Sequence, residues 1–506
     1  MMKSTFWALF FLILSCALAV FGTIIIPGKT GFYIGIGLIA LTLLCFLFPK
    51  KKSKIIAAVR SFLGLTKIKI GPFSWTVNDF CRGWLITGQT GSGKTVCGIK
   101  TIMSSLFKGT PNWGGVIVDP KGQFHKVVNE VAQNFNSTDK LIMLEVGPEA
   151  KNKYNLLSYP GISLNSYAQI ITDASESVGI KLDSFWRTAC IELITVMLML
   201  IEINKTPTFT DLYYMINDTE DLKALMDKLT LMSKKISDRD IQLALTKLKS
   251  HIATAKGQKD GITGSCKQIL GYFMLPEIRD IFCPEVNTVD FRDMEKGKIF
   301  ILKMGPKYDS ERYYFNTFLK LFFGVHSAHR LATLNRRSNL LVFMADEAQM
   351  IVTTSKRYSD HQTLSMTRES RATYILATQS TTSLAVELKD KCDVLILNIS
   401  NHIIFTVADE TAAQKASALF GKHTVTETSK SVTKGVTSTN YKEVEKPIYS
   451  ETELRGLKKY QCIIKHANGR HEKVYMPPVG KNGKTPFFYY RDRFNVFAWV
   501  LYLLQV

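Results

Sequence analysis

The stretch Trp84–Gly98, WLITGQTGSGKTVCG, decides the fold of this chain. It begins as an apolar run typical of a buried strand, and the residues after Thr95 suit a helix. Between them GQTGSGKT fits the pattern G-x-x-x-x-G-K-[ST] in full. In such loops backbone N–H groups surround phosphates, the lysine meets the β and γ oxygens, and the threonine holds Mg²⁺. The sequence therefore predicts a site for ATP and Mg²⁺ made by Gly88, Gln89, Thr90, Gly91, Ser92, Gly93, Lys94 and Thr95.

A phosphate loop needs an acidic partner at the end of another core strand. Asn339–Gln349, NLLVFMADEAQ, delivers two adjacent acids after an apolar run. We expect Asp346 to hold Mg²⁺ through water and Glu347 to act as general base on the attacking water. Adjacent acids favour an ATPase that hydrolyses repeatedly over a simple switch. The alternative is a strand that ends in two surface acids.

A second strand ends in an acid within Gly114–Phe124, GGVIVDPKGQF. Taken locally, DPKG is a turn in which proline and glycine serve their ordinary roles. Asp119 and Lys121 are therefore only candidate neighbours of the active site.

A third strand, Ala372–Ser380, ATYILATQS, ends in polar residues. In RecA-like sheets a polar residue at this place lies beside the phosphate loop, so Gln379 is expected to sense the γ-phosphate. Just upstream, TRESR carries Arg368 and Arg371, either of which could stabilise transition-state charge across a subunit interface. The alternative for either arginine is a surface ion pair.

The N-terminal fifty residues contain two apolar stretches without a charge, Thr5–Ile26 and Gly31–Phe48. Each has about the length that crosses a bilayer as a helix. The basic cluster PKKKSK, Pro49–Lys54, follows the second stretch and should stay in the cytoplasm with the rest of the chain. We expect a two-span hairpin with both termini in the cytoplasm. A cleaved signal peptide is the alternative for the first stretch and leaves this orientation unchanged.

The composition of the 506 residues is that of a folded protein, with 46% hydrophobic and 21% charged residues. The formal net charge of +21 favours polyanionic partners such as nucleic acid or an anionic membrane surface. A solvated basic surface is the alternative. The nine cysteines include no CxxC pair, which indicates reduced thiols rather than a metal site.

About 250 residues separate Lys94 from Asp346, and the middle of this segment shows apolar residues at helical spacing. We expect an inserted all-α domain there, after which a strand pattern resumes at Asp290–Pro306. The predicted organisation is a membrane hairpin (1–50), a first nucleotide-binding part (51–165), the all-α insert (166–285) and a second nucleotide-binding part (286–506).

The C-terminal third contains segments without a motif. The Ser/Thr/Lys-rich run 423–446 suggests an exposed hairpin or a flexible loop. His466 and His471 lack further ligands for a metal site. The apolar end, 494–506, is too short to span a membrane and suggests a docked strand or helix, with a partner-binding tail as the alternative.

In their order, these motifs resemble those of the coupling-protein ATPases of type IV secretion and conjugation, the TraG/TraD class. The resemblance covers nearly the whole chain. It includes the N-terminal apolar stretches and the segments GQTGSGKT, VIVDPKGQF, KYNLLS, DSFWRTAC, LLVFMADEAQM, TRESRATYILATQS, DETAAQKASALFGKHTV and KPIYSETELRGLKKYQCIIK. Two features depart from the family. The connection between the apolar stretches is only four residues long, and Leu156 replaces the proline of the usual Asn-Pro-Leu.

The resemblance implies an α/β, RecA-like P-loop NTPase with an all-α insert, preceded by two transmembrane helices in the bacterial inner membrane. It also implies a homo-hexamer that passes relaxase-bound single-stranded DNA or effector proteins to a type IV secretion channel. Residue by residue, it makes Lys94 and Thr95 the phosphate and Mg²⁺ ligands, Asp346 and Glu347 the acidic pair, Gln379 the γ-phosphate sensor and Arg368 the arginine that acts in trans.

Two alternatives remain at this stage. The first is a docking receptor for protein effectors alone, in which ATP hydrolysis times assembly and the helical insert binds the effector. The second is an unrelated DNA-pumping translocase, which the two-span anchor and the order of the motifs disfavour.

Overall fold

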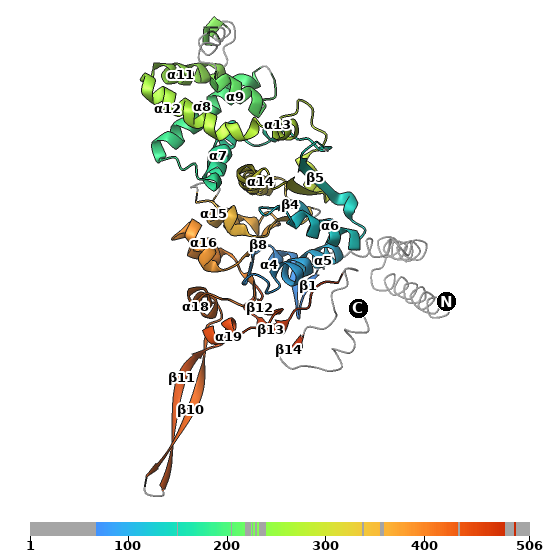
Figure 1. Ribbon diagram of the computed structural model, residues 1–506, viewed down its shortest axis with the longest axis vertical. Helices are drawn as coiled ribbons and strands as arrows, with labels where there is room; N and C mark the ends of the chain where they lie inside the picture. Colours follow the sequence, from blue (N-terminus) through green and yellow to red (C-terminus); the bar gives the residue numbers. More distant parts are fainter. Residues whose placement is uncertain are drawn as a thin grey trace, which may run out of the picture. The chain divides into compact units, whose positions relative to one another are not determined.

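The computed structural model of the chain describes residues 67–480 and 490–491, apart from 149, 204, 218–223, 225, 228–229, 232–238, 336–337, 355–358 and 434–435. The expected membrane hairpin, 1–50, and the apolar end, 494–506, lie outside the described residues. Lys67–Phe107 and the described residues from Asn112 onward form one compact unit. Figure 1 labels helices and strands of this unit.

A ten-stranded sheet forms the centre of this unit, in the order β14-β13-β12-β9-β3-β8-β7-β4-β6-β5. The seven strands from β9 to β5 are parallel, and β12, β13 and β14 add to β9 antiparallel. The bounds are β3 Trp84–Thr87, β4 Gly114–Val118, β5 Leu141–Val146, β6 Ile299–Met304, β7 Leu341–Ala345, β8 Ala372–Thr378, β9 Asn401–Ile404, β12 Gln461–Lys465, β13 His471–Tyr475 and β14 Tyr490–Arg491.

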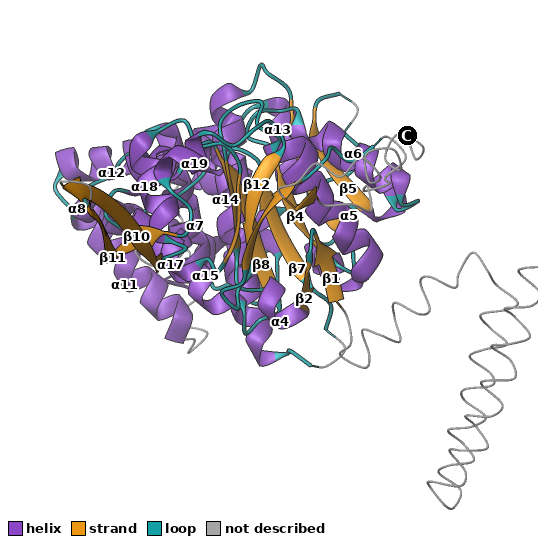
Figure 2. Ribbon diagram, turned by 90° about the horizontal axis from the view of Figure 1, so that it is seen from below, coloured by secondary structure: helices purple, strands orange, loops and turns teal. Residues whose placement is uncertain are grey.

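The middle strands β3, β4, β7 and β8 are buried at every position, as expected for parallel strands covered on both faces. Helices α5 (Lys100–Gly109) and α6 (Phe124–Asn134) pack on one face. The other face is covered by α14 (Asp309–His329), α15 (Asp360–Thr367), α16 (Thr381–Leu388) and α17 (Lys391–Asn398). Figure 2 shows these two layers on either side of the strands.

The chain between β5 and β6 is helical in most of its described residues. It contains α7 (Leu164–Ala174), α8 (Ser184–Glu202), α9 (Phe209–Asn217), α11 (Arg239–Ala253), α12 (Lys256–Leu270) and α13 (Pro276–Phe282). Among the described helices, α8 is long and apolar enough to cross a membrane, yet it packs against α7, α9, α11 and α12. This packing is that of the central helix of a helical layer.

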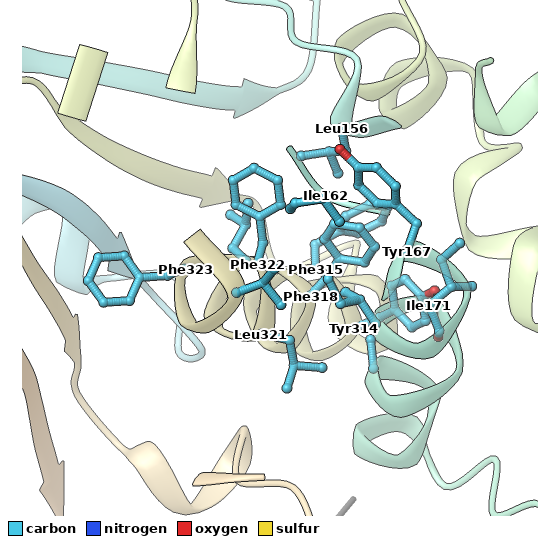
Figure 3. Close-up of a cluster of buried hydrophobic side chains, with 14 of the residues drawn as sticks. Leu156, Ile162, Tyr167, Ile171, Tyr314, Phe315, Phe318, Leu321, Phe322 and Phe323 are labelled. Atoms are coloured by element: carbon cyan, nitrogen blue, oxygen red, sulfur yellow. Dashed lines mark hydrogen bonds between the residues drawn. The ribbon is translucent and has the colours of Figure 1, made fainter. Parts of the chain in front are cut away.

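The helical segment shares one hydrophobic core with the sheet domain. Aromatic residues of α14 meet apolar residues of α7 and of the loop before it, as Figure 3 shows for Phe315 and Phe318 near Tyr167 and Ile171. Leu156, the residue that stands in place of the family's proline, is fully buried in this cluster. The domain limits expected at 166 and 285 stay predictions, since both parts belong to one compact unit.

Two hairpins lie apart from the central sheet. Strands β1 (Lys67–Ile70) and β2 (Phe73–Thr76) pair antiparallel before the short helix α4 (Val77–Phe80). Strands β10 (Lys422–Thr433) and β11 (Val436–Pro447) form a long, mostly exposed hairpin between α18 (Glu410–Ala418) and α19 (Glu451–Arg455). Of the two structures suggested for 423–446, the chain adopts the hairpin.

Candidate functional site

The phosphate loop joins β3 to the helix that begins at Lys94, at the carboxyl edge of the parallel strands. Gly91 and Gly93 take positive φ angles of 81° and 117°, which glycine adopts at little cost. A Cβ on Gly88 would lie 2.6 Å from Phe405 Cβ, and one on Gly93 would lie 2.9 Å from Tyr460 Cδ1. The loop can therefore take this path only with glycine at these positions, and its tip at Gln89, Thr90 and Gly91 is exposed.

The loop is fastened to the two strands beside β3. Gly88 N donates to Gln379 O at 3.2 Å, and Gln89 N donates to Thr406 O at 2.9 Å. After the loop, Gly93 O accepts from both Cys97 N and Gly98 N, so the first turn, Lys94–Ile99, is a π-helix. Such turns are rare and occur frequently at functional sites.

Lys94 is nearly buried at the helix start, with 7% of its surface exposed. Its Nζ donates to Gly88 O at 2.6 Å, which places the ammonium group inside the curve of the loop. Burial lowers the pKa of Lys94, and the nearby carboxylates Glu347 and Asp346 oppose that shift. The loop thus surrounds a cation with backbone, a suitable arrangement for phosphate oxygens.

Thr95 and Asp346 meet although 250 residues separate them. Asp346 follows β7, and its Oδ2 accepts a hydrogen bond from Thr95 Oγ1 at 2.8 Å. A hydroxyl and a carboxylate are the hard oxygen ligands that Mg²⁺ takes, so the pair fits this ion. Burial raises the pKa of Asp346, and Glu347 adds to the shift, whereas the bond from Thr95 opposes it.

Glu347 is 5% exposed and adopts a left-handed backbone, with φ 57°. Its Oε1 lies 2.5 Å from Lys121 Nζ, and its Oε2 accepts from Gln349 at 2.6 Å and from Gln379 at 3.4 Å. Burial raises its pKa, but the hydrogen bonds from Lys121 and Gln349 outweigh that effect and hold the pKa below its usual value. The carboxylate is therefore kept ionised, as a general base must be.

Asp119 and Lys121, expected only as neighbours of the active site, differ in whether they reach it. Lys121 reaches Glu347, whereas the carboxylate of Asp119 turns away and is buried at 1% exposure. Asp119 accepts from Gln123 N and His125 N, both at 2.9 Å, and from His125 Nδ1 at 2.8 Å. Asp119 therefore orders the turn and the start of α6 rather than the nucleotide.

The structure does not bring Arg368 or Arg371 to the phosphate loop of the same chain. Both precede β8, whose other end carries Gln379, and a strand of this length separates its ends by about 20 Å. Arg368 is exposed, and its Nε donates to Asn78 Oδ1 at 3.1 Å. Arg371 has φ 52°, and its carbonyl accepts from Leu341 N. Neither arginine therefore lies at the nucleotide site of its own chain.

The sequence prediction places Thr378 beside Gln379 at the end of the third strand but gives neither Thr378 nor Gln349 a role. Thr378 Oγ1 donates to Gln349 Oε1 at 2.9 Å, and Gln349 Nε2 donates to Glu347, so the pair ties the acid to β8. Thr378 ends β8, and Gln349 lies in the short turn that follows the two acids, so their nearness in sequence to Gln379 and Glu347 was the available signal. His466, by contrast, stacks on Trp75 with ring centroids 4.6 Å apart. Among the described residues no group of three His, Cys, Asp or Glu side chains is placed to bind a metal ion.

Comparison with known proteins places this geometry in a family. The family model described as type IV secretory system conjugative DNA transfer matches residues 49–473. No curated protein matches the chain significantly.

Solved structures of the bacterial conjugative coupling protein TrwB share the fold. The unbound form is 17% identical with a TM-score of 0.63, over 84% of this chain and 91% of that chain. The complex of TrwB with ADP and Mg²⁺ is 14% identical with a TM-score of 0.61, over 85% and 90% of the two chains. The complex with the non-hydrolysable ATP analogue ADPNP is 15% identical with a TM-score of 0.61, over 84% and 92%. Because the family match spans most of the chain and the fold agrees, the protein belongs to the type IV secretion family of conjugative DNA transfer coupling proteins.

Proposed function

We propose that this protein is a membrane-anchored, Mg²⁺-dependent ATPase that recruits a relaxase-bound single-stranded DNA or a protein substrate and drives it into a type IV secretion channel. The observation that carries the proposal is the set of contacts at the carboxyl edge of the sheet. There Lys94 lies within the phosphate loop, Thr95 meets Asp346, and Glu347 meets Gln379.

ATP and Mg²⁺ are the proposed cofactors. The narrow glycine loop, the buried Lys94 and the oxygen ligands Thr95 and Asp346 suit a triphosphate with its metal. TrwB, which shares the fold, has been solved with ADP and Mg²⁺ and with an ATP analogue. When bound, Mg²⁺ neutralises charge on the β and γ oxygens and orients them for attack in line.

The side chains have separate roles in hydrolysis. Lys94 stabilises the negative charge that develops on the phosphate oxygens. Glu347 accepts a proton from the attacking water, and Gln379, bonded to Glu347 Oε2, reports the γ-phosphate to β8. Arg368 acts in trans, since its place at the far end of β8 makes it available to a neighbouring subunit alone.

The proposed arrangement in the cell is an inference from the sequence pattern and the resemblance to the family. Residues 1–50 anchor the chain in the bacterial inner membrane by two spans, with both termini in the cytoplasm. A homo-hexamer supplies the neighbour that Arg368 requires. The helical segment 166–285 is the proposed contact surface for the substrate or for channel components.

Single-stranded DNA is the favoured cargo because the formal net charge is +21. Contacts with phosphates release counterions, so binding should weaken steeply with salt. The alternative cargo is protein effectors alone, with hydrolysis timing assembly.

The test uses the full chain reconstituted in lipid vesicles, with Lys94→Ala as control. We expect salt-sensitive binding of single-stranded DNA, hydrolysis that this DNA accelerates, and no hydrolysis above background in the variant. If single-stranded DNA neither bound to the protein nor accelerated hydrolysis, the result would favour the receptor for protein effectors. Undiminished hydrolysis by Lys94→Ala would refute the assigned site. In cells, Lys94→Ala should abolish conjugative transfer of a mobilisable plasmid.

A further inference from the structure

The roles proposed above leave the ion pair between Lys121 and Glu347 unexplained. The lysine side chain is 48% exposed, whereas the glutamate side chain is 7% exposed, and their charged atoms lie 2.5 Å apart. A flexible, well hydrated lysine at the surface gains little from an ordinary ion pair. Here it reaches inward to the carboxylate that must take a proton from water.

Both carboxylate oxygens of Glu347 already accept hydrogen bonds. Lys121 engages Oε1, and Gln349 and Gln379 engage Oε2. Gln379 follows β8 directly, Gln349 lies in the short turn after β7, and both are neutral, so they orient the group without removing its charge. Lys121 is the single cation that donates a hydrogen bond to Glu347 among the described residues. A base acts through an oxygen within hydrogen-bond distance of the water, so the cation on Oε1 opposes that step.

The turn that carries Lys121 is held on several sides. Asp119 accepts three hydrogen bonds from Gln123 and His125, which fixes the residue on one side of the turn. Gly122, on the other side, has φ 72°, and a Cβ there would lie 3.2 Å from Met304 O. The backbone on both sides of Lys121 is thus fixed, and the side chain starts from a defined place.

Helix α14 makes two of the contacts that hold this turn. Arg312 Nε donates to Pro120 O at 2.7 Å, and Asn316 Oδ1 accepts from Asp119 N at 3.1 Å. Both side chains are buried, at 6% and 0% exposure. A shift of α14 would therefore move the base of Lys121.

The same helix packs against the helical segment. Tyr314 OH donates to Ile171 O of α7 at 3.2 Å, and the aromatic face of α14 fills the cluster in Figure 3. Helix α14 thus contacts the turn of Lys121 on one side and the proposed substrate surface on the other. Buried contacts thus run from the helical segment through α14 to the turn of Lys121, and the half-exposed Lys121 side chain makes the last contact with the general base.

We propose that Lys121 is a positioning residue that restrains Glu347 by occupying Oε1, so that this oxygen does not bind the attacking water. Helix α14 holds the turn that carries Lys121. Basal hydrolysis is therefore slow until Lys121 moves away from Glu347. The inference rests on the proposed function, because it concerns the regulation of the same ATPase site. Withdrawal requires no covalent step, since it exchanges one hydrogen bond of the carboxylate for one to water.

The experiment measures kcat and KM for Mg-ATP hydrolysis by the full chain in lipid vesicles without DNA. In Lys121→Met we expect kcat to rise about threefold or more with KM unchanged, since a restraint on the base affects the chemical step alone. Lys121→Arg, which keeps a cationic donor, should stay near the wild-type rate. The matched control is Lys153→Met, because Lys153 pairs with Asp280 at the same 2.5 Å but lies outside the site.

Two further variants separate restraint from other roles. In a Glu347→Gln background, Lys121→Met should change nothing, because the base that it restrains is absent. Arg312→Lys loses the bond to Pro120 O and should raise kcat in the same direction as Lys121→Met, by less. An unchanged kcat in Arg312→Lys would contradict the claim that α14 positions the turn of Lys121.

The outcomes also distinguish the inference from the function beneath it. A fall or no change of kcat in Lys121→Met, with unaltered thermal unfolding, would overturn the restraint and make Lys121 a phosphate ligand or a neutral bystander. A rise that persists in the Glu347→Gln background would overturn it as well. If the wild-type chain hydrolysed no ATP, or Lys94→Ala hydrolysed it equally well, the proposed function would fail and the inference with it.

Discussion

The two edges of the central sheet carry similar charged residues, but these residues bind different kinds of group. At the carboxyl edge, Glu347, Lys121 and Gln379 bond mainly to one another through side chains. At the amino edge, Arg330 donates to backbone carbonyls of Ser370 and Asn339, and to Glu295. The first arrangement can exchange its partners for a ligand. The second fastens strand ends together, so a charge cluster alone does not indicate a site.

Burial sharpens this contrast. Arg330 is 4% exposed, and its donors are satisfied by five acceptors on three segments of the chain. Leaving a buried guanidinium without partners costs several kcal/mol. Arg330 therefore holds the strand ends at the amino edge in fixed positions. At the carboxyl edge the tip of the phosphate loop and the Lys121 side chain are exposed. Side chains that can exchange their partners for a ligand therefore lie at the carboxyl edge, where we place ATP hydrolysis.

The largest expected effect comes from an arginine at the amino edge. Arg368→Ala should lower hydrolysis about 10³-fold in the assembled protein, because an arginine supplied in trans stabilises transition-state charge. Mixing this variant with Lys94→Ala should restore part of the activity, since some interfaces then join an intact Lys94 to an intact Arg368. Both variants are measured alone and mixed at equal total concentration.

The control for that variant is Asn78→Ala, which removes the partner of Arg368 Nε and leaves the arginine in place. Its rate should stay near that of the wild type. Failure of the mixture to recover any activity would contradict an action in trans and leave Arg368 as a surface residue.

The next effect belongs to the carboxyl edge. Glu347→Gln should lower kcat about 10²- to 10³-fold, because the amide cannot accept the proton of the attacking water. Nucleotide affinity, measured with a fluorescent ATP analogue, should remain. Glu295→Gln changes an acid at the other edge and should leave kcat unaffected. Equal losses in the two variants would erase the distinction between the edges.

Much of the fold could be predicted because local patterns and tertiary structure agree. The strands that end at Thr87, Ala345 and Thr378 contain no charged residue and are mostly apolar, as parallel strands buried on both faces require. The hairpin at 423–446 was one of two suggestions, because Ser, Thr and Lys suit both a loop and an exposed strand. The shared core between α7 and α14 was not predicted, since periodicity shows an apolar face but not its partner.

The site was predictable where the chain order forces neighbours together. Residues that follow parallel strands meet at the same edge of the sheet, and β8 alone separates β3 from β7, so the contact between Thr95 and Asp346 follows from the motifs. The ion pair of Lys121 with Glu347 could not be predicted, because a DPKG turn has a sufficient local explanation. The path of the turn in the structure shows that Lys121 points to Glu347, whereas Asp119 points to His125 at the start of α6.

A stability effect of about 3 kcal/mol is expected at the amino edge. Arg330→Met should lower the free energy of unfolding by roughly this amount, because it removes the donor of Glu295 Oε2 and of several carbonyls, while His326 keeps its contact with Glu295 Oε1. Chemical denaturation of the full chain in detergent measures the change. Arg292→Ala is the control, since Arg292 contacts Asp290 at an exposed place and its loss should leave the midpoint unchanged. A comparable loss in both variants would show that the edge is not fastened by Arg330.

The smallest effect expected at this edge depends on pH. His402, in β9, is 1% exposed, and burial together with Lys465 lowers its pKa from 6.5 to about 4. Above pH 6.5 the ring is neutral in both the folded and the unfolded chain, so it contributes no slope. Between pH 6.5 and 4 only the unfolded chain binds the proton, and the free energy of unfolding should fall by about 1.4 kcal/mol per pH unit as pH decreases.

His402→Gln should remove this part of the slope, whereas the exposed His423→Gln should keep it. Denaturation at pH 7.0, 6.0 and 5.0 provides the comparison between the two variants and the wild type. An identical slope in all three proteins would mean that His402 accepts its proton within the folded sheet. The amino edge would then have room for a charge, and the rigidity that distinguishes it from the carboxyl edge would be lost at β9.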